Sequence, residues 1–144
     1  MRNDVELFPG IVGKEYFAEM KYKKILIVDD EPDMRETISS YLKPRHFKIY
    51  EAGNGVEALG AIKKKRPDLI ILDVVMPVMN GFELLEKIRR NSSFSKIPVI
   101  MLTVKSQGPY IDKGISLNVN FYLPKPVKLH NLLEFINLVL GGII

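Results

Sequence analysis

Unbroken runs of aliphatic residues set the strongest limit on how this chain can fold. Residues 25–28 read Ile-Leu-Ile-Val and residues 69–72 read Leu-Ile-Ile-Leu, and an aspartate directly follows each run. A strand with one buried face alternates apolar and polar residues, whereas a strand buried on both faces reads as a continuous apolar run. These two segments therefore predict central strands of a parallel sheet that is covered on both faces.

From residue 24 onward, strand patterns alternate with helix patterns. Segments 47–52, 98–102 and 121–123 predict three more strands, and the first of them is less hydrophobic, which suits a sheet edge. Apolar residues at helical spacing, bounded by capping and breaking residues, predict five helices. We place these helices between Pro32 and Pro44 and over residues 55–65, 82–88, 110–117 and 129–140. Five strands alternating with five helices indicate a doubly wound α/β fold with helices on both faces.

The composition excludes several classes of protein. The 144 residues, 47% hydrophobic and 26% charged, are typical of one folded domain. The lack of cysteine excludes disulfides, thiol catalysis and cysteine zinc sites, and two histidines are too few for a multi-histidine metal site. The sequence holds neither the ~20 apolar residues of a membrane helix nor a secretory signal. We expect a cytoplasmic protein without membrane contacts.

The positive charge is spread over two clusters that have ordinary explanations. The net charge is +4, with basic residues gathered over 21–24 and 63–66. The first cluster flanks a predicted strand, and the second ends a helix, where cations interact favourably with the helix dipole. We therefore expect no direct contact with nucleic acid. Residues 1–23 follow no clear pattern, so we expect an N-terminal extension of unknown role followed by one domain over residues 24–144.

Polar side chains follow four of the five predicted strands. They are Asp29 and Asp30 after the first strand, Asp73 after the third, Thr103 after the fourth and Lys125 after the fifth. Ligands of open α/β sheets bind beyond the carboxyl ends of the strands, where these side chains would converge. Carboxylates within ~5 Å repel by about 3 kcal/mol per pair at an effective dielectric near ~20, so a compensating cation is needed. Ligands that are all oxygen favour magnesium or manganese.

These residue types point to phosphoryl transfer. A divalent cation, a lysine and a hydroxyl around a carboxylate are components of a phosphoryl-transfer site, and the carboxylate can itself be the nucleophile that forms an acyl phosphate. Taken singly, each residue has a plainer explanation, since an aspartate after a strand is usually a cap or turn residue. The combination at four strand ends is much more specific than any one member.

Several motifs resemble those of response-regulator receiver domains. Residues 25–32, Ile-Leu-Ile-Val-Asp-Asp-Glu-Pro, resemble the opening of that family, and residues 72–81 resemble its phosphoacceptor loop. Leu102-Thr103 and residues 122–126, Tyr-Leu-Pro-Lys-Pro, resemble its two remaining motifs. The resemblance covers residues 24–140. It implies a flavodoxin-like (βα)5 fold with a parallel five-stranded sheet in the order 2-1-3-4-5.

The resemblance implies an acceptor residue and a metal site. Asp73 would accept a phosphoryl group from a sensor histidine kinase or a phosphotransfer protein. Asp29, Asp30, Asp73 and the backbone carbonyl of Val75 would hold Mg²⁺, for which Mn²⁺ can substitute. The domain would act on itself, catalysing its own aspartyl phosphorylation and slow dephosphorylation, and would not be an enzyme for other substrates.

The resemblance also implies a switch. Lys125 would pair with the phosphoryl oxygens, Thr103 would hydrogen-bond them, and Tyr122 would rotate inward behind Thr103. The peptide bond between Lys125 and Pro126 would be cis. The surface formed by residues 110–140 would then change and signal to a downstream protein target or output domain, and phosphorylation-dependent homodimers are a further expectation. Because the chain ends after the last helix, we expect a stand-alone receiver or one cut from a longer protein.

The sequence departs from the family pattern at three places. Val104 stands where a small residue is usual, residues 118–121 replace a commoner Gly-Ala-acid-acid stretch, and Asn80 stands where aspartate is frequent. The bulkier Val104 would narrow access to the phosphoryl site and alter the rate of hydrolysis. None of these changes removes a site residue, so the sequence indicates an active receiver.

Two other functions compete with this interpretation. The pattern Gly53-x-Gly55-x-x-Ala58 follows a strand and opens a helix, and Asp73 lies 20 residues after Gly53. This arrangement satisfies a dinucleotide-binding fingerprint. That motif follows the second strand, however, and leaves the other strand-end residues unexplained. The other alternative is a binding module of the same fold that has lost phosphorylation, and the intact set of site residues argues against it.

Overall fold

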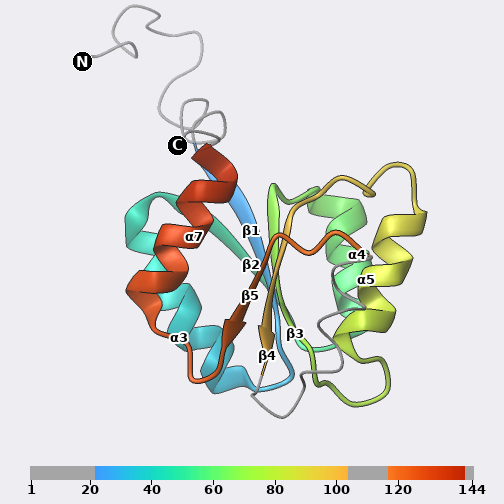
Figure 1. The fold of residues 1–144 in the computed structure, drawn as a ribbon, viewed down its shortest axis with the longest axis horizontal. Helices are drawn as coiled ribbons and strands as arrows, with labels where there is room; N and C mark the ends of the chain where they lie inside the picture. Colours follow the sequence, from blue (N-terminus) through green and yellow to red (C-terminus); the bar gives the residue numbers. More distant parts are fainter. Residues whose placement is uncertain (1–21, 104–116, 142–144) are drawn as a thin grey trace, which may run out of the picture.

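The computed structural model describes residues 22–103 and 117–141, which form a parallel sheet between two layers of helices (Figure 1). The strands are β1 (Lys23–Val28), β2 (Phe47–Ala52), β3 (Leu69–Asp73), β4 (Val99–Thr103) and β5 (Phe121–Pro124). They lie in the order β2-β1-β3-β4-β5, and all neighbours are parallel. The five predicted strands and the order implied by the resemblance are confirmed, and β2 lies at an edge.

Helices cover both faces of the sheet, as the doubly wound fold requires. Helices α3 (Pro32–Leu42) and α7 (Leu129–Gly141) lie on one face, and α4 (Gly55–Lys65) and α5 (Gly81–Arg90) lie on the other (Figure 1). Four predicted helices are thus confirmed. Most of the helix predicted over residues 110–117 lies outside the described residues, as do Val104 and nearly all of segment 1–23. Within the described ranges, no helix has the length and apolar character needed to span a membrane.

The aliphatic runs of β1 and β3 form the centre of two hydrophobic cores. Side chains of residues 25–28 and 69–72 are at most 1% exposed. Successive side chains of a strand point to opposite faces. Leu26 and Ile70 therefore pack with α4 and α5, whereas Ile25 and Ile71 pack with α3 and α7. A polar residue anywhere in these runs would be buried in one of the two cores, which explains why the runs are unbroken.

Asparagine caps start the two helices on the α4 and α5 face. The Asn54 side chain accepts a hydrogen bond from the Glu57 amide at 2.9 Å and so caps the start of α4. Asn80 forms a complete capping box with Glu83, in which each side chain accepts from the other's amide. Asn80 therefore acts as a helix cap, a role that the sequence pattern alone did not predict. Both caps satisfy amides that the first helical turn leaves without partners.

Gly81 allows α5 to begin directly against β3. A Cβ atom at this position would collide with the Asp73 carbonyl oxygen and would lie 3.0 Å from the Val74 Cα. The Gly81 amide donates a hydrogen bond to the Val74 carbonyl at 2.8 Å, which holds the two backbones together. The close approach fixes where the loop after Asp73 ends.

We expect Gly81→Ala to lower the free energy of unfolding by about 2–3 kcal/mol, because the backbone must shift to admit the methyl group. Gly60 provides the matched control, since it is exposed within α4 and no atom would lie within 4 Å of its Cβ. Gly60→Ala should raise the free energy of unfolding by about 0.5–1 kcal/mol. Urea unfolding measures both, and equal effects of the two substitutions would contradict the role given to Gly81.

Candidate functional site

Three carboxylates meet at the carboxyl edge of the sheet. Asp29 and Asp30 follow β1, and Asp73 ends β3, the strand that pairs with β1. Each offers a carboxylate oxygen, and these oxygens all lie within 4.8 Å of one another. Asp29 and Asp73 are buried, whereas Asp30 is exposed. The three aspartates that the sequence placed at strand ends are therefore brought together as expected.

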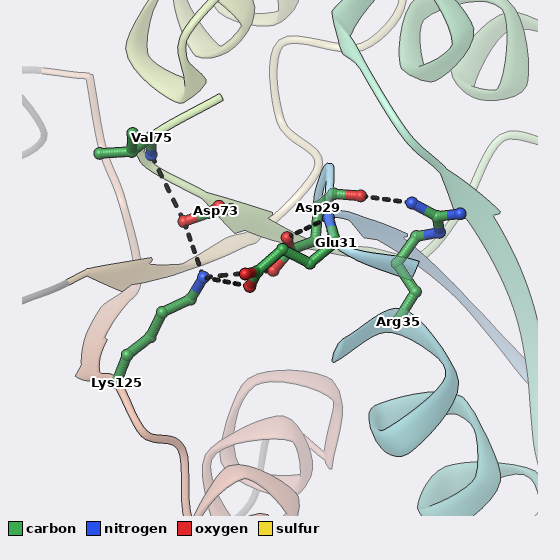
Figure 2. Close-up of polar contacts among 6 residues, drawn as sticks. All are labelled: Asp29, Glu31, Arg35, Asp73, Val75 and Lys125. Carbon is green, nitrogen blue, oxygen red and sulfur yellow. Dashed lines mark hydrogen bonds and ion pairs between the residues drawn. The ribbon is translucent and has the colours of Figure 1, made fainter. Parts of the chain in front are cut away.

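Lys125 lies between the buried carboxylates (Figure 2). Its Nζ is 3.2 Å from Asp73 Oδ1, 3.3 Å from Asp29 Oδ2 and 4.0 Å from Glu31 Oε1. The lysine follows β5, and its amide donates to the Thr103 carbonyl at 2.8 Å, which fixes the start of its side chain. The Lys125–Pro126 peptide bond is cis, as the resemblance implied. One ammonium group thus joins residues from β1, β3 and β5.

The electrostatics of the site favour binding of positive charge. Burial, followed by the charge of Asp29, raises the pKa of Asp73 from 3.8 to about 6, and Lys125 offsets only part of that shift. Burial by itself lowers the pKa of Lys125, but the charges of Asp73 and Asp29 outweigh burial and raise it. Lys125 is therefore a fixed cation, and the buried carboxylates of Asp29 and Asp73 share it.

Backbone and side-chain contacts hold the carboxylates in place. The Glu31 amide donates to Asp29 Oδ1 at 2.9 Å, and the Arg35 guanidinium donates to the Asp29 carbonyl at 2.7 Å (Figure 2). The Val75 amide lies 3.4 Å from Asp73 Oδ1. The sequence did not predict the contacts of Glu31 and Arg35. Their position just after Asp29-Asp30, in the first turns of a helix, was the only signal that could have suggested them.

Thr103 and Tyr122 lie on the neighbouring strands β4 and β5. Thr103 is the last residue of β4 and lies beside the end of β3 that carries Asp73. The side chains of Thr103 and Tyr122 are both partly buried. Tyr122 packs against the core on the α4 and α5 side, and burial raises the pKa of its hydroxyl. The switching roles of these two residues and the metal-binding role of the Val75 carbonyl stay predictions.

The donor set fits a hard divalent cation. Three carboxylate oxygens within 4.8 Å provide the oxygen ligands that Mg²⁺ and Mn²⁺ prefer. With three negative charges and one lysine, the cluster also keeps an excess negative charge that a cation would neutralise. The arrangement brings a buried carboxylate, a fixed cation and a cluster of carboxylates suited to a metal ion to one place, and phosphoryl transfer uses these components.

The glycines of the dinucleotide-like motif form the connection between edge strand β2 and α4. The Gly53 amide donates to Glu57 Oε1 at 2.7 Å. A Cβ at Gly55 would meet the Met79 side chain, so a residue of the β3–α5 loop occupies the space beside that glycine. The glycines are therefore explained by contacts within the fold.

Comparison with known proteins agrees with this geometry. The family model described as "Response regulator receiver domain" matches residues 25–137. Protein PilH of Pseudomonas aeruginosa is 34% identical over 119 residues, which cover 83% of this chain and 98% of PilH. The probable transcriptional regulator ycf29 of Pyropia yezoensis is 41% identical over 118 residues, which cover 82% of this chain but only 53% of that protein. The chain thus spans about half the length of some relatives.

Solved structures give the same result. The chemotaxis protein CheY4 of Vibrio cholerae has a TM-score of 0.77 and 34% sequence identity, and the alignment covers 82% of this chain and 98% of CheY4. The fold, the family model and the near full-length match to PilH agree with one another. This chain therefore belongs to the response regulator receiver domain family.

Proposed function

We propose that Asp73 is a phosphoacceptor and that the chain carries signals by being phosphorylated there. The observation that carries this proposal is the buried Asp73 carboxylate, 3.2 Å from Lys125 and within 4.8 Å of two further carboxylates. A structural ion pair needs one carboxylate for one lysine, whereas this cluster gathers three carboxylates near one lysine. The donor would be a phosphohistidine of a sensor histidine kinase or a phosphotransfer protein, and the setting would be the cytoplasm.

The chemical step follows from the residues around Asp73. A carboxylate oxygen of Asp73 attacks phosphorus, the bond from phosphorus to the donor histidine nitrogen breaks, and an acyl phosphate forms. With a pKa of about 6, Asp73 is mainly ionised near neutral pH and can act as the nucleophile. The Lys125 ammonium pairs with the transferred oxygens, and the Thr103 hydroxyl donates to them. A Mg²⁺ or Mn²⁺ ion held by Asp29, Asp30, Asp73 and the Val75 carbonyl would supply further positive charge.

The same contacts support a switch. Phosphorylation adds negative charge beside Lys125, and β5 links Lys125 to Tyr122 within a few residues. Thr103 would turn toward the phosphoryl group, Tyr122 would rotate inward, and the surface over residues 110–140 would change for a downstream protein or output domain, or for a second copy of the chain. Moving such an equilibrium from ~1:99 to ~99:1 needs about 5.5 kcal/mol of differential interaction.

Labelling with acetyl phosphate and Mg²⁺ tests the acceptor directly. We expect intact-mass spectrometry to show one added phosphoryl group on the wild-type chain and none on Asp73→Asn. Asp33→Asn is the matched control, because Asp33 is exposed in the first turn of α3 and should leave labelling unchanged. Labelling of Asp73→Asn would refute the acceptor assignment. A wild-type chain that takes no phosphoryl group would favour the binding module that has lost phosphorylation.

Metal binding should be visible as stabilisation. We expect Mg²⁺ or Mn²⁺ to raise the melting temperature of the wild-type chain. At a metal concentration of ~10 times the dissociation constant, the free energy of unfolding should rise by about 1.4 kcal/mol. Asp30→Asn should need a metal concentration at least ~10-fold higher for the same stabilisation, because it removes a carboxylate from the proposed metal site. Asp30 is exposed, so the substitution leaves the hydrophobic core unchanged. Asp33→Asn again serves as control. An Asp30→Asn response equal to that of the wild type would remove Asp30 from the metal site.

The raised pKa of Asp73 predicts how metal-free stability depends on pH. The folded chain disfavours the ionised carboxylate of Asp73. The contribution of Asp73 to the free energy of unfolding therefore falls as the pH rises from 3.8 to about 6, and it stays lower above that range. In EDTA at about pH 7.5, Asp73→Asn should be more stable than the wild type by about 2–3 kcal/mol, and the difference should vanish toward about pH 4. Urea unfolding at several pH values measures it. A difference that does not change with pH would contradict this assignment.

A further inference from the structure

Basic side chains gather at the amino edge of the sheet, which is opposite the phosphoacceptor site and at the top of Figure 1. On the α4 and α5 side, the segments that lead into β1, β3 and β4 are residues 22–24, 63–68 and 86–98. They are rich in lysine and arginine, and their only carboxylates are those of Asp68 and Glu86. We call the exposed cations of these segments the basic edge: Lys23, Lys63, Lys64, Arg66, Arg90 and Lys96.

Contacts between these segments join them into one surface. The Lys24 ammonium group donates to the Lys65 carbonyl at 3.1 Å, which links the start of β1 to the end of α4. The Arg66 guanidinium lies over the Phe94 ring, 5.5 Å from its centroid, which links α4 to the loop before β4. The two basic clusters that are separate in the sequence are therefore neighbours in the fold, and the α5–β4 connection adds a third.

The described part of the chain does not neutralise this surface with its own acids. Ion pairs between two described residues involve only Arg35 and Lys125, whose carboxylate partners lie toward the opposite edge. Asp68 accepts a hydrogen bond from the Lys24 amide at 2.8 Å and so holds the backbone. The basic edge therefore keeps its positive charge for solvent or for a partner.

Helix dipoles explain only part of this charge. Cations in the last turn of a helix interact favourably with its dipole, by about 0.3–1 kcal/mol each. This effect accounts for residues 63–65 at the end of α4 and for Arg90 at the end of α5. Lys23 opens β1 and Lys96 lies in the loop before β4, so the dipoles do not explain them. Like charges on one surface repel one another, and an anionic partner would relieve that repulsion.

The composition of the basic edge suits a polyanion better than a protein or a membrane. The centre of a protein interface is depleted of lysine and enriched in aromatic residues, and helices that lie on a membrane insert apolar side chains. A nucleic acid duplex instead presents rows of phosphates, which lysine and arginine bind without apolar contacts. Among the described residues, the exposed large hydrophobic side chains all lie outside the basic edge: Val56, Val75, Val78 and Leu138.

The aromatic rings near the basic edge favour a duplex over a single strand. Single-stranded nucleic acid is bound largely through rings on which its bases stack. Here the Lys65 ammonium group lies over the Tyr50 ring, 5.2 Å from its centroid, and Arg66 covers Phe94, which is only 4% exposed. The chain's own cations thus occupy these rings, so phosphates are the groups that the surface can contact.

We propose that the basic edge binds the phosphate backbone of a nucleic acid duplex without reading its sequence. This replaces the expectation of no direct contact with nucleic acid, which considered each cluster by itself. Asp30, Glu31 and Glu57 are exposed at the opposite edge and would repel phosphates, so the duplex would approach the basic edge alone. A bound duplex would leave the phosphoacceptor site uncovered, and the proposal does not depend on the function of that site.

Fluorescence anisotropy of the full chain with a labelled DNA duplex of about 20 base pairs tests the proposal. The test variant, Lys64→Gln with Lys96→Gln, removes two exposed cations from the basic edge. Lys128→Glu is the control, because Lys128 is exposed between β5 and α7 at the opposite edge and its reversal changes the net charge equally. We expect wild-type binding to weaken at least ~10-fold between ~50 and ~200 mM salt. At ~50 mM salt the test variant should bind at least ~10-fold more weakly, with the control within ~2-fold of the wild type.

The other outcomes overturn the proposal. A wild-type chain that does not bind the duplex, or a test variant that binds it equally well, removes the basic edge as a binding surface. Equal weakening by the control assigns binding to net charge alone. Tighter binding to a single-stranded oligonucleotide, to vesicles rich in phosphatidylserine or to polyglutamate assigns the surface to that class of partner instead. Acetyl phosphate labelling of the test variant should match that of the wild type, so a failure of labelling contradicts the proposed function and not duplex binding.

Discussion

The ammonium group of Lys125, placed between two buried carboxylates, is the interaction on which the site depends. Asp29 and Asp73 are on neighbouring strands, and Lys125 reaches both from β5 at 3.3 and 3.2 Å. Burying either carboxylate alone would carry a large desolvation penalty, and burying both together adds their repulsion. The lysine offsets part of this free energy and leaves Asp30 and an excess negative charge facing solvent. The same geometry therefore holds the sheet edge together and leaves it with a negative charge that favours cations.

Most of the fold was predictable because burial leaves a direct mark on the sequence. The continuous runs of β1 and β3 identified central strands, and the weaker run of β2 identified an edge. The order of the strands was not contained in these patterns, since periodicity does not say which strands pair, and it came from the resemblance. Pro44, expected to stop the first helix, lies in a short 3-10 turn, Lys43–Arg45, because proline is tolerated where its missing amide has no helical partner.

The site was predictable where backbone topology decides it and not where long side chains do. Parallel strands bring their carboxyl ends together, so the positions of Asp29, Asp73 and Lys125 followed from the strand assignment. By contrast, Arg89 donates hydrogen bonds to four carbonyls, those of Leu117, Asn118, Ser95 and Ile97. These acceptors come from two segments on either side of β4, and no sequence pattern pairs them. Arg89 thus ties α5 to the residues that lead into β5, the strand that carries Tyr122 and Lys125.

Two unfavourable features of the described residues lie at the end of β3 and in the loop that follows it. Asp73 is a carboxylate whose ionised form the fold disfavours, and Val78 has a strained backbone and no burial. The cores on both sides of the sheet provide the stability that tolerates them. Because the folded chain disfavours the ionised Asp73, any ligand that adds positive charge there relieves a penalty that the unfolded chain never had. Such a ligand would stabilise the folded chain relative to the unfolded chain and would organise the site at the same time.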